Sequence, residues 1–307
     1  MNVGGGGLAP DCSRMGGPDF IVIGAQRAGT TWFYEVLDRH PAFWLPPIKE
    51  LHFFDDPLSN NRERYYSFLR TRLTAGLGLK HPLSLWDVRY FLQPRGDEWY
   101  RRLFLSANKR RMLTGDITPS YATLDESAFR RMQCINPAVK IVFIMRDPVM
   151  RSWSSVLKSR RKHGETGLPT ALTAIGHAQR EGVVSKSSYV STIEKLERVF
   201  AEAQIFYGFF DDIVAEPKTF ITRVLSFLGC EPDDVGRFLP TKPVGSAAAG
   251  RRPPLEFERA LAAMFLDDIR KLCQQFDGPP QKWLARYEAM LQESRLELRQ
   301  ASCHRGA

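Results

Sequence analysis

The residues best suited to bind a phosphate follow the first apolar run of the chain. The run Phe20–Ile23 leads directly into Gly24–Thr31, whose sequence is GAQRAGTT. A glycine-bounded loop between a strand and a helix points backbone N–H groups and the positive end of the helix dipole at an anion. The spacing from Gly24 to Gly29 matches the G-x-x-x-x-G of a P-loop, but Thr30 replaces the lysine that NTPases require. The segment therefore predicts a phosphate site that is not built for ordinary ATP or GTP chemistry.

A second candidate for phosphate binding is Arg146, which follows the strongest strand pattern of the chain, Val139–Met145. Open α/β sheets bind ligands at the carboxyl ends of their strands, and the fork of a guanidinium suits a phosphate. Asp147 is expected to orient Arg146, and Pro148 favours a helix that starts there. Ser154 falls about two turns further along that helix. The alternatives are a surface salt bridge for Arg146 and a plain helix serine for Ser154.

Glu50 and His52 are the residues best suited to move a proton. They lie in Lys49–Phe54 (KELHFF), inside a loop rich in proline and aromatic residues that is expected over 41–60. Partial burial would raise the pKa of Glu50 toward a value useful for a general base, whereas Lys49 would oppose that shift. The alternatives are a solvated loop carboxylate and a packed histidine.

Apolar runs and helical stripes alternate along the chain. The expected strands are Phe20–Ile23, Met112–Ile117, Val139–Met145 and Ile205–Phe210, and the expected helices are Thr30–Arg39, 189–200, Pro217–Leu228, 255–276 and 280–300. This alternation predicts a three-layer α/β sandwich with a central, mainly parallel sheet and a P-loop-like nucleotide-binding loop. We expect a disordered tail over 1–17, a single domain over 18–300 and a second tail over 301–307. The segments 160–184 and 241–254 are expected to be loops.

Composition and charge limit the class of protein. The chain has 307 residues, of which 43% are hydrophobic, and a net charge of +9 that favours anionic partners without selecting among them. Its five cysteines form no C-x-x-C pair, which argues against a disulfide framework or a zinc site. No apolar run is long enough to span a membrane and no signal-peptide pattern is visible. We therefore expect a cytoplasmic protein without stable membrane insertion.

Several of these segments, in this order, resemble sulfotransferases that use 3′-phosphoadenosine 5′-phosphosulfate (PAPS). Gly24–Thr31 resembles their 5′-phosphosulfate loop, and Arg146 with Ser154 resembles their 3′-phosphate motif. Lys49–Phe54 resembles a loop of the heparan sulfate sulfotransferase branch, in which a glutamate is the proposed base. Other segments that fit the family are Gly115–Tyr121, Phe209–Pro217, Phe227–Gly229 and Gly250–Arg252. The resemblance covers about residues 18–290.

The resemblance implies PAPS as co-substrate, no metal, and a defined set of nucleotide contacts. The implied contacts are Arg27, Ala28, Gly29, Thr30 and Thr31 for the 5′-phosphate, Arg146 and Ser154 for the 3′-phosphate, Tyr189 near the adenosine, and Gly250, Arg251 and Arg252 in a loop over the 3′-phosphate and purine, for which the alternative is a solvated charged face. Trp32 is a further candidate to face the nucleotide, and the alternative is a core aromatic. Many family members have lysine where this chain has Arg27, and such a lysine can also protonate the leaving oxygen. Arginine stays charged, so Arg27 is expected to act electrostatically.

The reaction implied by the resemblance moves a sulfuryl group from PAPS to an acceptor hydroxyl of a small molecule, glycolipid or sugar. Glu50 is the implied base and His52 the rival base. Such a transfer needs in-line positioning and stabilisation of charge on the leaving phosphate. No nucleic-acid partner is expected. Two other functions are considered, namely a P-loop small-molecule kinase or NTPase that binds ATP with Mg²⁺, and an inactive nucleotide- or glycan-binding module.

Overall fold

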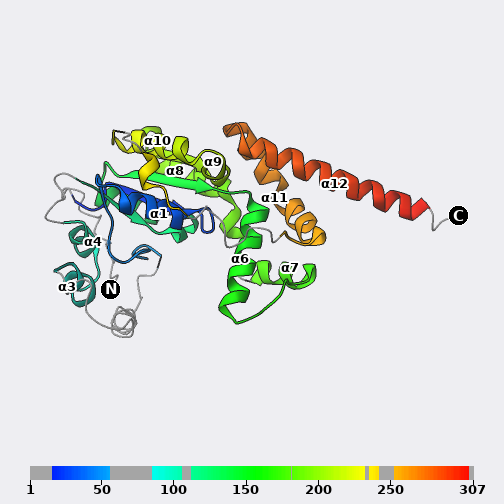
Figure 1. Ribbon diagram of the computed structural model, residues 1–307, viewed down its shortest axis with the longest axis horizontal. Coiled ribbons are helices and arrows are strands. Elements are labelled where there is room, and N and C mark those ends of the chain that lie inside the picture. The colour runs from blue at the N-terminus through cyan, green and yellow to red at the C-terminus, as the bar shows by residue number, and fades with distance from the viewer. Residues whose placement is uncertain are drawn as a thin grey trace, which may run out of the picture.

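The computed structural model of the protein describes residues 16–55, 85–105, 112–180, 182–231, 235–241 and 252–303. Its centre is a sheet of five parallel strands in the order β2-β3-β1-β4-β5 (Figure 1). The strands are β1 (Phe20–Gly24), β2 (Phe43–Trp44), β3 (Leu113–Ile117), β4 (Lys140–Met145) and β5 (Ile205–Phe209). The expected central parallel sheet is confirmed.

The two central strands are apolar along almost their whole length. Every residue of β1 is buried, and so is β4 from its second residue onward. Strands covered on both faces give continuous apolar runs, which is why the sequence revealed them. The edge strand β2 lies inside the segment 41–60, which was expected to be a loop. The sequence did not reveal this strand because two residues are too few to form a recognisable pattern.

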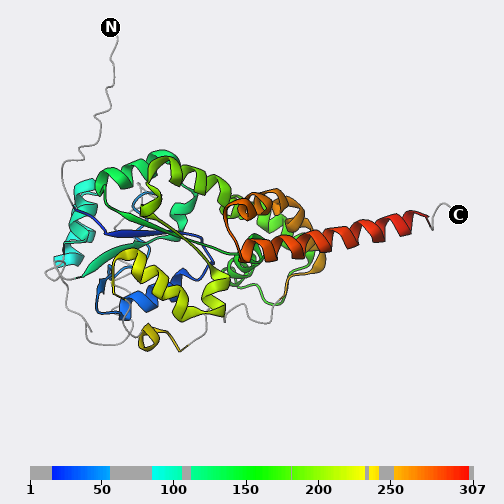
Figure 2. The same cartoon turned by 90° about the horizontal axis from the view of Figure 1, so that it is seen from above.

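Helices cover both faces of the sheet and complete the three layers (Figure 2). On one face Phe33 of α1 meets Phe220 of α10, and on the other α5 packs beside α8. The helices are α1 (Thr30–Arg39), α3 (Leu85–Leu92), α4 (Asp97–Leu103), α5 (Glu126–Ile135), α6 (Pro148–Lys162), α7 (Ala171–Arg180), α8 (Tyr189–Val199), α9 (Phe210–Ala215), α10 (Pro217–Leu228), α11 (Leu255–Gln275) and α12 (Pro279–Cys303).

The expectation of a loop over 160–184 is wrong for most of that segment. α6 continues to Lys162, and α7 occupies ten of the residues that follow. The glycines that suggested a loop, Gly164 and Gly167, serve the connection between the two helices. α7 buries Ala174 and Ala178, one turn apart, so small side chains rather than a strong apolar stripe hold it in place.

The C-terminal helices α11 and α12 pack against each other beyond one end of the sheet, where α11 also meets α6 and α7 (Figure 1). α12 points away from the sheet and continues to Cys303, past the boundary expected at residue 300. Within the described ranges, no helix combines the length and the apolar character needed to cross a bilayer.

Candidate active site

Two of the predicted phosphate-binding residues lie at the carboxyl edge of the sheet. Arg27 lies in the loop after β1, and Arg146 follows β4 directly. These strands are neighbours, but the chain leaves β1 toward β2 and β3 on one side and returns to β4 on the other. Open α/β sheets bind their ligands at such a reversal of strand order, because the two loops diverge and leave a crevice.

The N-terminus of α1 has the geometry of an anion site. Gly29, the residue before the helix, has a φ of 85°, which a residue without a side chain adopts easily. The first-turn N–H groups of a helix have no partner within the helix, and the first turn of α1 contains no acidic residue. The available donors begin with Gly29, Thr30 and Thr31, because Ala28 N–H donates to Ala25 O at 3.1 Å. Such donors suit the oxygens of a phosphate.

Arg27 joins the two predicted phosphate motifs. Its Nε donates to Ser154 Oγ at 3.0 Å, and its carbonyl oxygen accepts from Arg146 Nη1 at 2.9 Å. Spacing along α6 did not show whether Ser154 lies near Arg146. The structure brings both residues against Arg27, so the two predicted phosphate motifs lie side by side.

Arg146 is held through its backbone and its side chain. The hydroxyl of Tyr189 donates to the carbonyl oxygen of Arg146 at 2.8 Å, and burial raises the pKa of this tyrosine to about 12, so it stays a donor. The guanidinium carbon lies 4.3 Å from the centre of the Phe210 ring, within cation–π distance. Tyr189 therefore positions Arg146 in the described site.

Asp147 does not orient Arg146 as the sequence suggested. Its Oδ1 accepts from the N–H groups of Val149 and Met150 at 2.9 and 3.2 Å, which caps α6, and its Oδ2 accepts from Tyr287 Oη at 2.6 Å. A cap of this kind stabilises a helix by about 1 kcal/mol. Asp147 therefore fixes the start of α6 and ties it to α12.

Arg151 belongs to the same cluster, although the sequence did not single it out. Its side chain is fully buried and donates to Gln26 O in the loop after β1, and to Val183 O and Ser187 Oγ before α8. These acceptors are neutral. In the sequence, Arg151 is a second arginine shortly after Arg146, and an arginine within a helix is usually exposed on its surface.

The arginines create a concentration of positive charge. Burial lowers the pKa of Arg27, and the charges of Arg146 and Arg161 lower it further. Burial also lowers the pKa of Arg151, with contributions from Arg146 and Arg27. Buried like charges are unfavourable unless a counter-charge compensates them, so the site favours a ligand with more than one anionic group.

Glu50 and His52 lie together in residues 49–55, here called the base loop. His52 Nε2 is 3.6 Å from Glu50 Oε2, and His52 Nδ1 is 2.8 Å from Asp55 Oδ2, so the imidazole lies between two carboxylates. Glu50 and His52 have φ values of 62° and 51°, and Arg27 has 72°. Left-handed conformations of this kind cost about 1–3 kcal/mol and cluster at functional sites. Asp55 was missed because nothing in the sequence placed it beside the histidine.

The pKa of Glu50 is lowered overall, although burial raises it and Lys49 opposes that rise, as expected. The contact with His52 is the largest cause, and the charges of Lys49 and Lys158 act in the same direction, while burial opposes them. The carboxylate is therefore ionised at neutral pH and able to accept a proton.

A buried carboxyl at the end of β3 fixes the base loop. Asp116 accepts from Thr118 Oγ1 at 2.6 Å and from Tyr121 Oη at 3.1 Å. These hydroxyls in turn accept from the backbone N–H groups of Leu51 and Phe53, at 3.0 and 2.8 Å. The two N–H groups flank the histidine, so this network holds the loop in its unusual backbone conformation.

Ionisation of Asp116 is expected to reduce stability as the pH rises. Burial raises the pKa of Asp116 from 3.8 to about 6, so the folded protein keeps a proton that the unfolded chain has lost. This contribution, up to about 3 kcal/mol, is present below the unfolded pKa and is lost as the pH rises to about 6. Urea unfolding between about pH 4 and 7 should show the stability of the wild type falling relative to Asp116→Asn. A difference that does not change with pH would contradict this assignment.

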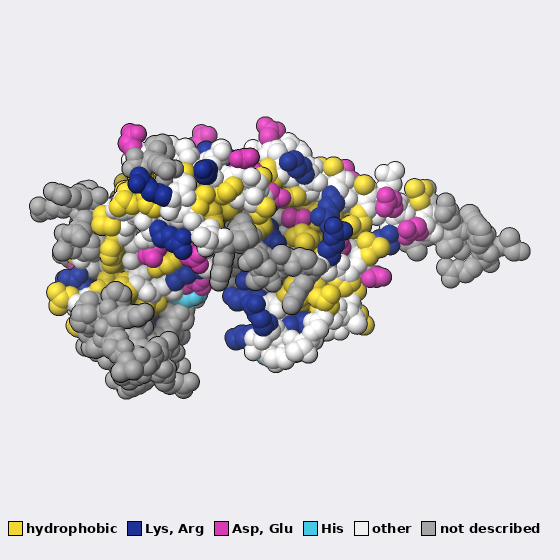
Figure 3. Space-filling view, in the orientation of Figure 1, with side chains coloured by type: hydrophobic (Ala, Val, Ile, Leu, Met, Phe, Trp, Pro, Cys, Tyr) yellow, Lys and Arg dark blue, Asp and Glu magenta, His cyan; other side chains and the backbone are white. Residues whose placement is uncertain are grey.

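A basic face of α6 continues from the phosphate site. Lys158 and Arg161 follow Ser154 at helical spacing on one side of the helix, where Lys158 acts electrostatically on Glu50 and Arg161 on Arg27. Figure 3 shows a hollow between the part of the molecule that contains α1 and the α6–α7 pair, with Lys and Arg side chains gathered on the α6–α7 side. The hollow therefore has positive charge near the proposed base.

Among the described residues, the remaining predicted nucleotide contacts form no hydrogen bond with Arg27 or Arg146. Trp32 is buried in the core, and Arg252 is exposed at the approach to α11. Gly250 and Arg251 lie outside the described residues. Across the described part of the chain, no group of three or more His, Cys, Asp or Glu side chains is placed to hold a metal ion.

Two solved sulfotransferases share this arrangement of sheet and helices. A sulfotransferase from Alicyclobacillus acidocaldarius superposes with a TM-score of 0.57 at 21% identity and covers 90% of this chain and 96% of its own. The sulfotransferase domain from the curacin biosynthetic pathway gives a TM-score of 0.52 at 17% identity, over 80% of this chain and 83% of its own. The fold is therefore that of the known sulfotransferases.

The chain belongs to the sulfotransferase family, whose family model matches residues 18–234. The mouse (Mus musculus) heparan sulfate glucosamine 3-O-sulfotransferase 5 is 24% identical over 70% of this chain and 54% of its own length. The membrane-associated sulfotransferase kil1 of Dictyostelium discoideum is 27% identical over 45% of this chain and 22% of its own length. The resemblance seen in the motifs is confirmed, and the chain spans about half the length of the first of these relatives.

Proposed function

We propose that the protein transfers a sulfuryl group from PAPS to an acceptor hydroxyl and releases 3′,5′-adenosine bisphosphate (PAP). The observation that carries this proposal is the position of Arg27, which contacts both Ser154 and Arg146. An ordinary nucleoside triphosphate has all its phosphates at one end and needs one anion site. A nucleotide with phosphates on both its 5′ and 3′ positions needs two adjoining anion sites, which matches the cluster of arginines.

Glu50 acts as the general base in this reaction. As the bond between the acceptor oxygen and sulfur forms, the acceptor proton moves to the Glu50 carboxylate, which its neighbours keep ionised. His52, whose ring is oriented by Asp55, holds this carboxylate in place. The Asp116 network positions the loop that contains both groups.

The leaving group is stabilised at the N-terminus of α1. The bond between sulfur and the bridging oxygen breaks, and its electron pair goes to the 5′-phosphate of PAP. The N–H groups of Gly29–Thr31 and the charge of Arg27 stabilise that phosphate. Arg146 and Ser154 hold the 3′-phosphate and so align the donor with the acceptor.

The acceptor is a hydroxyl of a sugar or a small molecule. Lys158 and Arg161 lie on the basic face of α6, where their charges favour an acceptor that itself carries negative charge. The name of the 3-O-sulfotransferase relative points to a glycan acceptor of this kind. We therefore propose that the acceptor is a sugar or small-molecule hydroxyl near an anionic group.

Thermal unfolding with PAP, AMP, ADP and ATP–Mg²⁺ tests the proposed function. PAP is expected to give the largest rise in melting temperature, because it alone in this set occupies both anion sites. At about 100 times its Kd, a ligand of the folded state adds about 2.7 kcal/mol of stability. A larger rise with ATP–Mg²⁺ would favour a kinase or NTPase instead. PAP binding without turnover of labelled PAPS on any sugar or small-molecule hydroxyl would favour an inactive binding module.

A further inference from the structure

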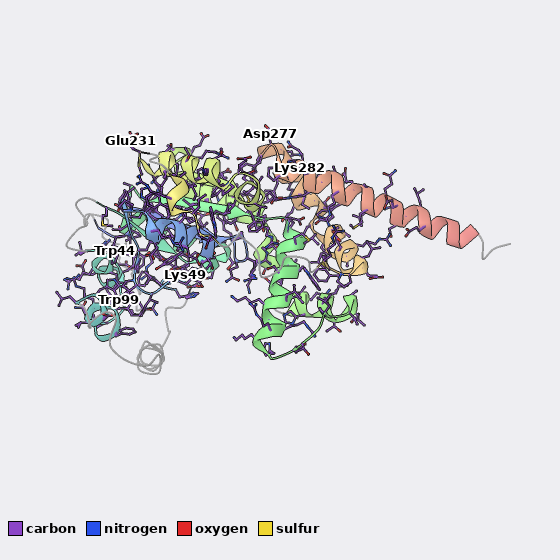
Figure 4. The ribbon with its side chains drawn as sticks, viewed as in Figure 1. Trp44, Lys49, Trp99, Glu231, Asp277 and Lys282 are labelled. Atoms are coloured by element: carbon purple, nitrogen blue, oxygen red, sulfur yellow. The ribbon has the colours of Figure 1, made fainter. Side chains whose placement is uncertain are left out.

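Lys49 connects the base loop to the phosphate-binding loop. Its Nζ donates to Thr31 Oγ1 at 2.7 Å and lies 3.6 Å from Glu50 Oε1. In Figure 4 the Lys49 label lies just below α1. The side chain is 25% exposed, and burial lowers the pKa of its ammonium group. A single ammonium group therefore lies between the proposed base and the N-terminus of α1.

The surroundings of Lys49 compensate its positive charge only in part. The N-terminus of a helix is the positive end of its dipole, so a cation there costs about 0.3–1 kcal/mol. The first turn of α1 has no acidic residue, and Lys158 adds repulsion. Glu50 and Glu35 offset part of this cost, and the Tyr34 ring centre lies 5.9 Å from the ammonium, but partly exposed contacts of this kind contribute about 0–1 kcal/mol each. The hydrogen bond to Thr31 thus holds the ammonium at a place where a bound anion would compensate the remaining cost.

Arg27 is held toward α6 by its contact with Ser154. Its Nε is already engaged by Ser154 Oγ, and its pKa is lowered by burial and by neighbouring positive charges. Its side chain is therefore directed toward α6, the side of the 3′ motif. Lys49 approaches the first turn of α1 from the base loop, through Thr31.

We infer that Lys49 is a second cation for the 5′-phosphate, supplied by the base loop; this inference rests on the proposed function. During transfer, the acceptor oxygen forms its bond to sulfur and its proton goes to Glu50. The bond from sulfur to the bridging oxygen breaks, and Lys49 Nζ–H donates a hydrogen bond to the oxygen that gains the electron pair. Base and leaving-group cation are adjacent residues, so the Asp116 network positions both.

Calorimetric titration with PAP and with adenosine 3′-phosphate, which lacks the 5′-phosphate, tests this inference. Lys49→Met is expected to weaken PAP binding about 10- to 100-fold, the effect of losing one charge-assisted hydrogen bond. Its affinity for adenosine 3′-phosphate should stay within about twofold. Lys49→Arg keeps the charge and should recover most of the PAP affinity. Lys218→Met removes an exposed lysine on α10 and is the matched control.

The outcomes separate this inference from the proposed function. If Lys49→Met binds PAP as tightly as the wild type, Lys49 is not a ligand of the 5′-phosphate and the proposed function is unaffected. If the variant loses equal affinity for both nucleotides, Lys49 supports the shape of the site, and the inference also fails. If the wild type does not bind PAP, the proposed function fails first. Lys49→Gln, which can still donate to Thr31, provides the same comparison if the Met variant does not fold.

Discussion

Replacing Glu50 by Gln is expected to lower the turnover number by a factor of about 10²–10⁴, the usual contribution of a general base. The amide has almost the same shape but cannot accept the proton that the acceptor hydroxyl must lose. Affinity for PAP should fall by much less than turnover, because Glu50 touches the nucleotide site only through Lys49, which the variant retains. Turnover is measured with labelled PAPS on a hydroxyl acceptor that the wild type sulfates.

The matched control for this variant is Glu256→Gln, which changes an exposed carboxylate in the first turn of α11. It should retain wild-type turnover. If Glu50→Gln also retains wild-type turnover, Glu50 is not the base, and His52→Asn becomes the variant to compare. If His52 instead carries the proton, His52→Asn lowers turnover by the larger factor.

Replacing Arg146 by Ala is expected to weaken PAP binding about 10- to 100-fold, equivalent to the loss of hydrogen bonds from a charged donor to a phosphate. Affinity for AMP, which has no 3′-phosphate, should fall much less, because the 5′-phosphate is held by α1 and Arg27. Calorimetric titration with the two nucleotides measures both effects. A loss of PAP affinity larger than the loss of AMP affinity measures the contribution of Arg146 to binding the 3′-phosphate.

Two further variants show whether Arg146 acts through its positive charge or by supporting the loop after β1. Arg146 Nη1 also donates to the carbonyl oxygen of Arg27, so its removal could disturb the loop after β1. Arg146→Lys keeps the charge and should recover part of the PAP affinity, while Arg102→Ala removes an exposed arginine of α4 and should change nothing. Equal losses for PAP and AMP in Arg146→Ala would show that the arginine supports the loop and does not select the 3′-phosphate.

Sequence reasoning succeeded where the signal was local. β1 and β4 are continuous apolar runs because helices cover both faces of the sheet, and Gly29 precedes α1 as the phosphate motif requires. The parallel order of strands then follows from alternating strands and helices. For the same reason Arg27 and Arg146 could be placed at the carboxyl edge of the sheet before any contact between them was known.

Sequence reasoning failed where a side chain's role depends on partners far along the chain. Asp147 lies next to Arg146, but its carboxylate caps α6 and binds Tyr287, which is 140 residues away. The pKa of Glu50 is set mainly by its contact with His52 and moves in the opposite direction to the one that burial alone predicts. Arg151 looked like an ordinary helix residue until the chain segments around it were known.

The sequence alone therefore determined the type of fold and the two phosphate motifs, since both depend on the order of residues within short segments. Only the tertiary structure decided that Ser154 and Arg146 meet at Arg27, and that Lys49 reaches Thr31 from the base loop. The physical reason is that hydrogen bonds and charge repulsion depend on distances of a few ångströms. Such distances between segments are set by how helices pack on the sheet, which no local pattern encodes.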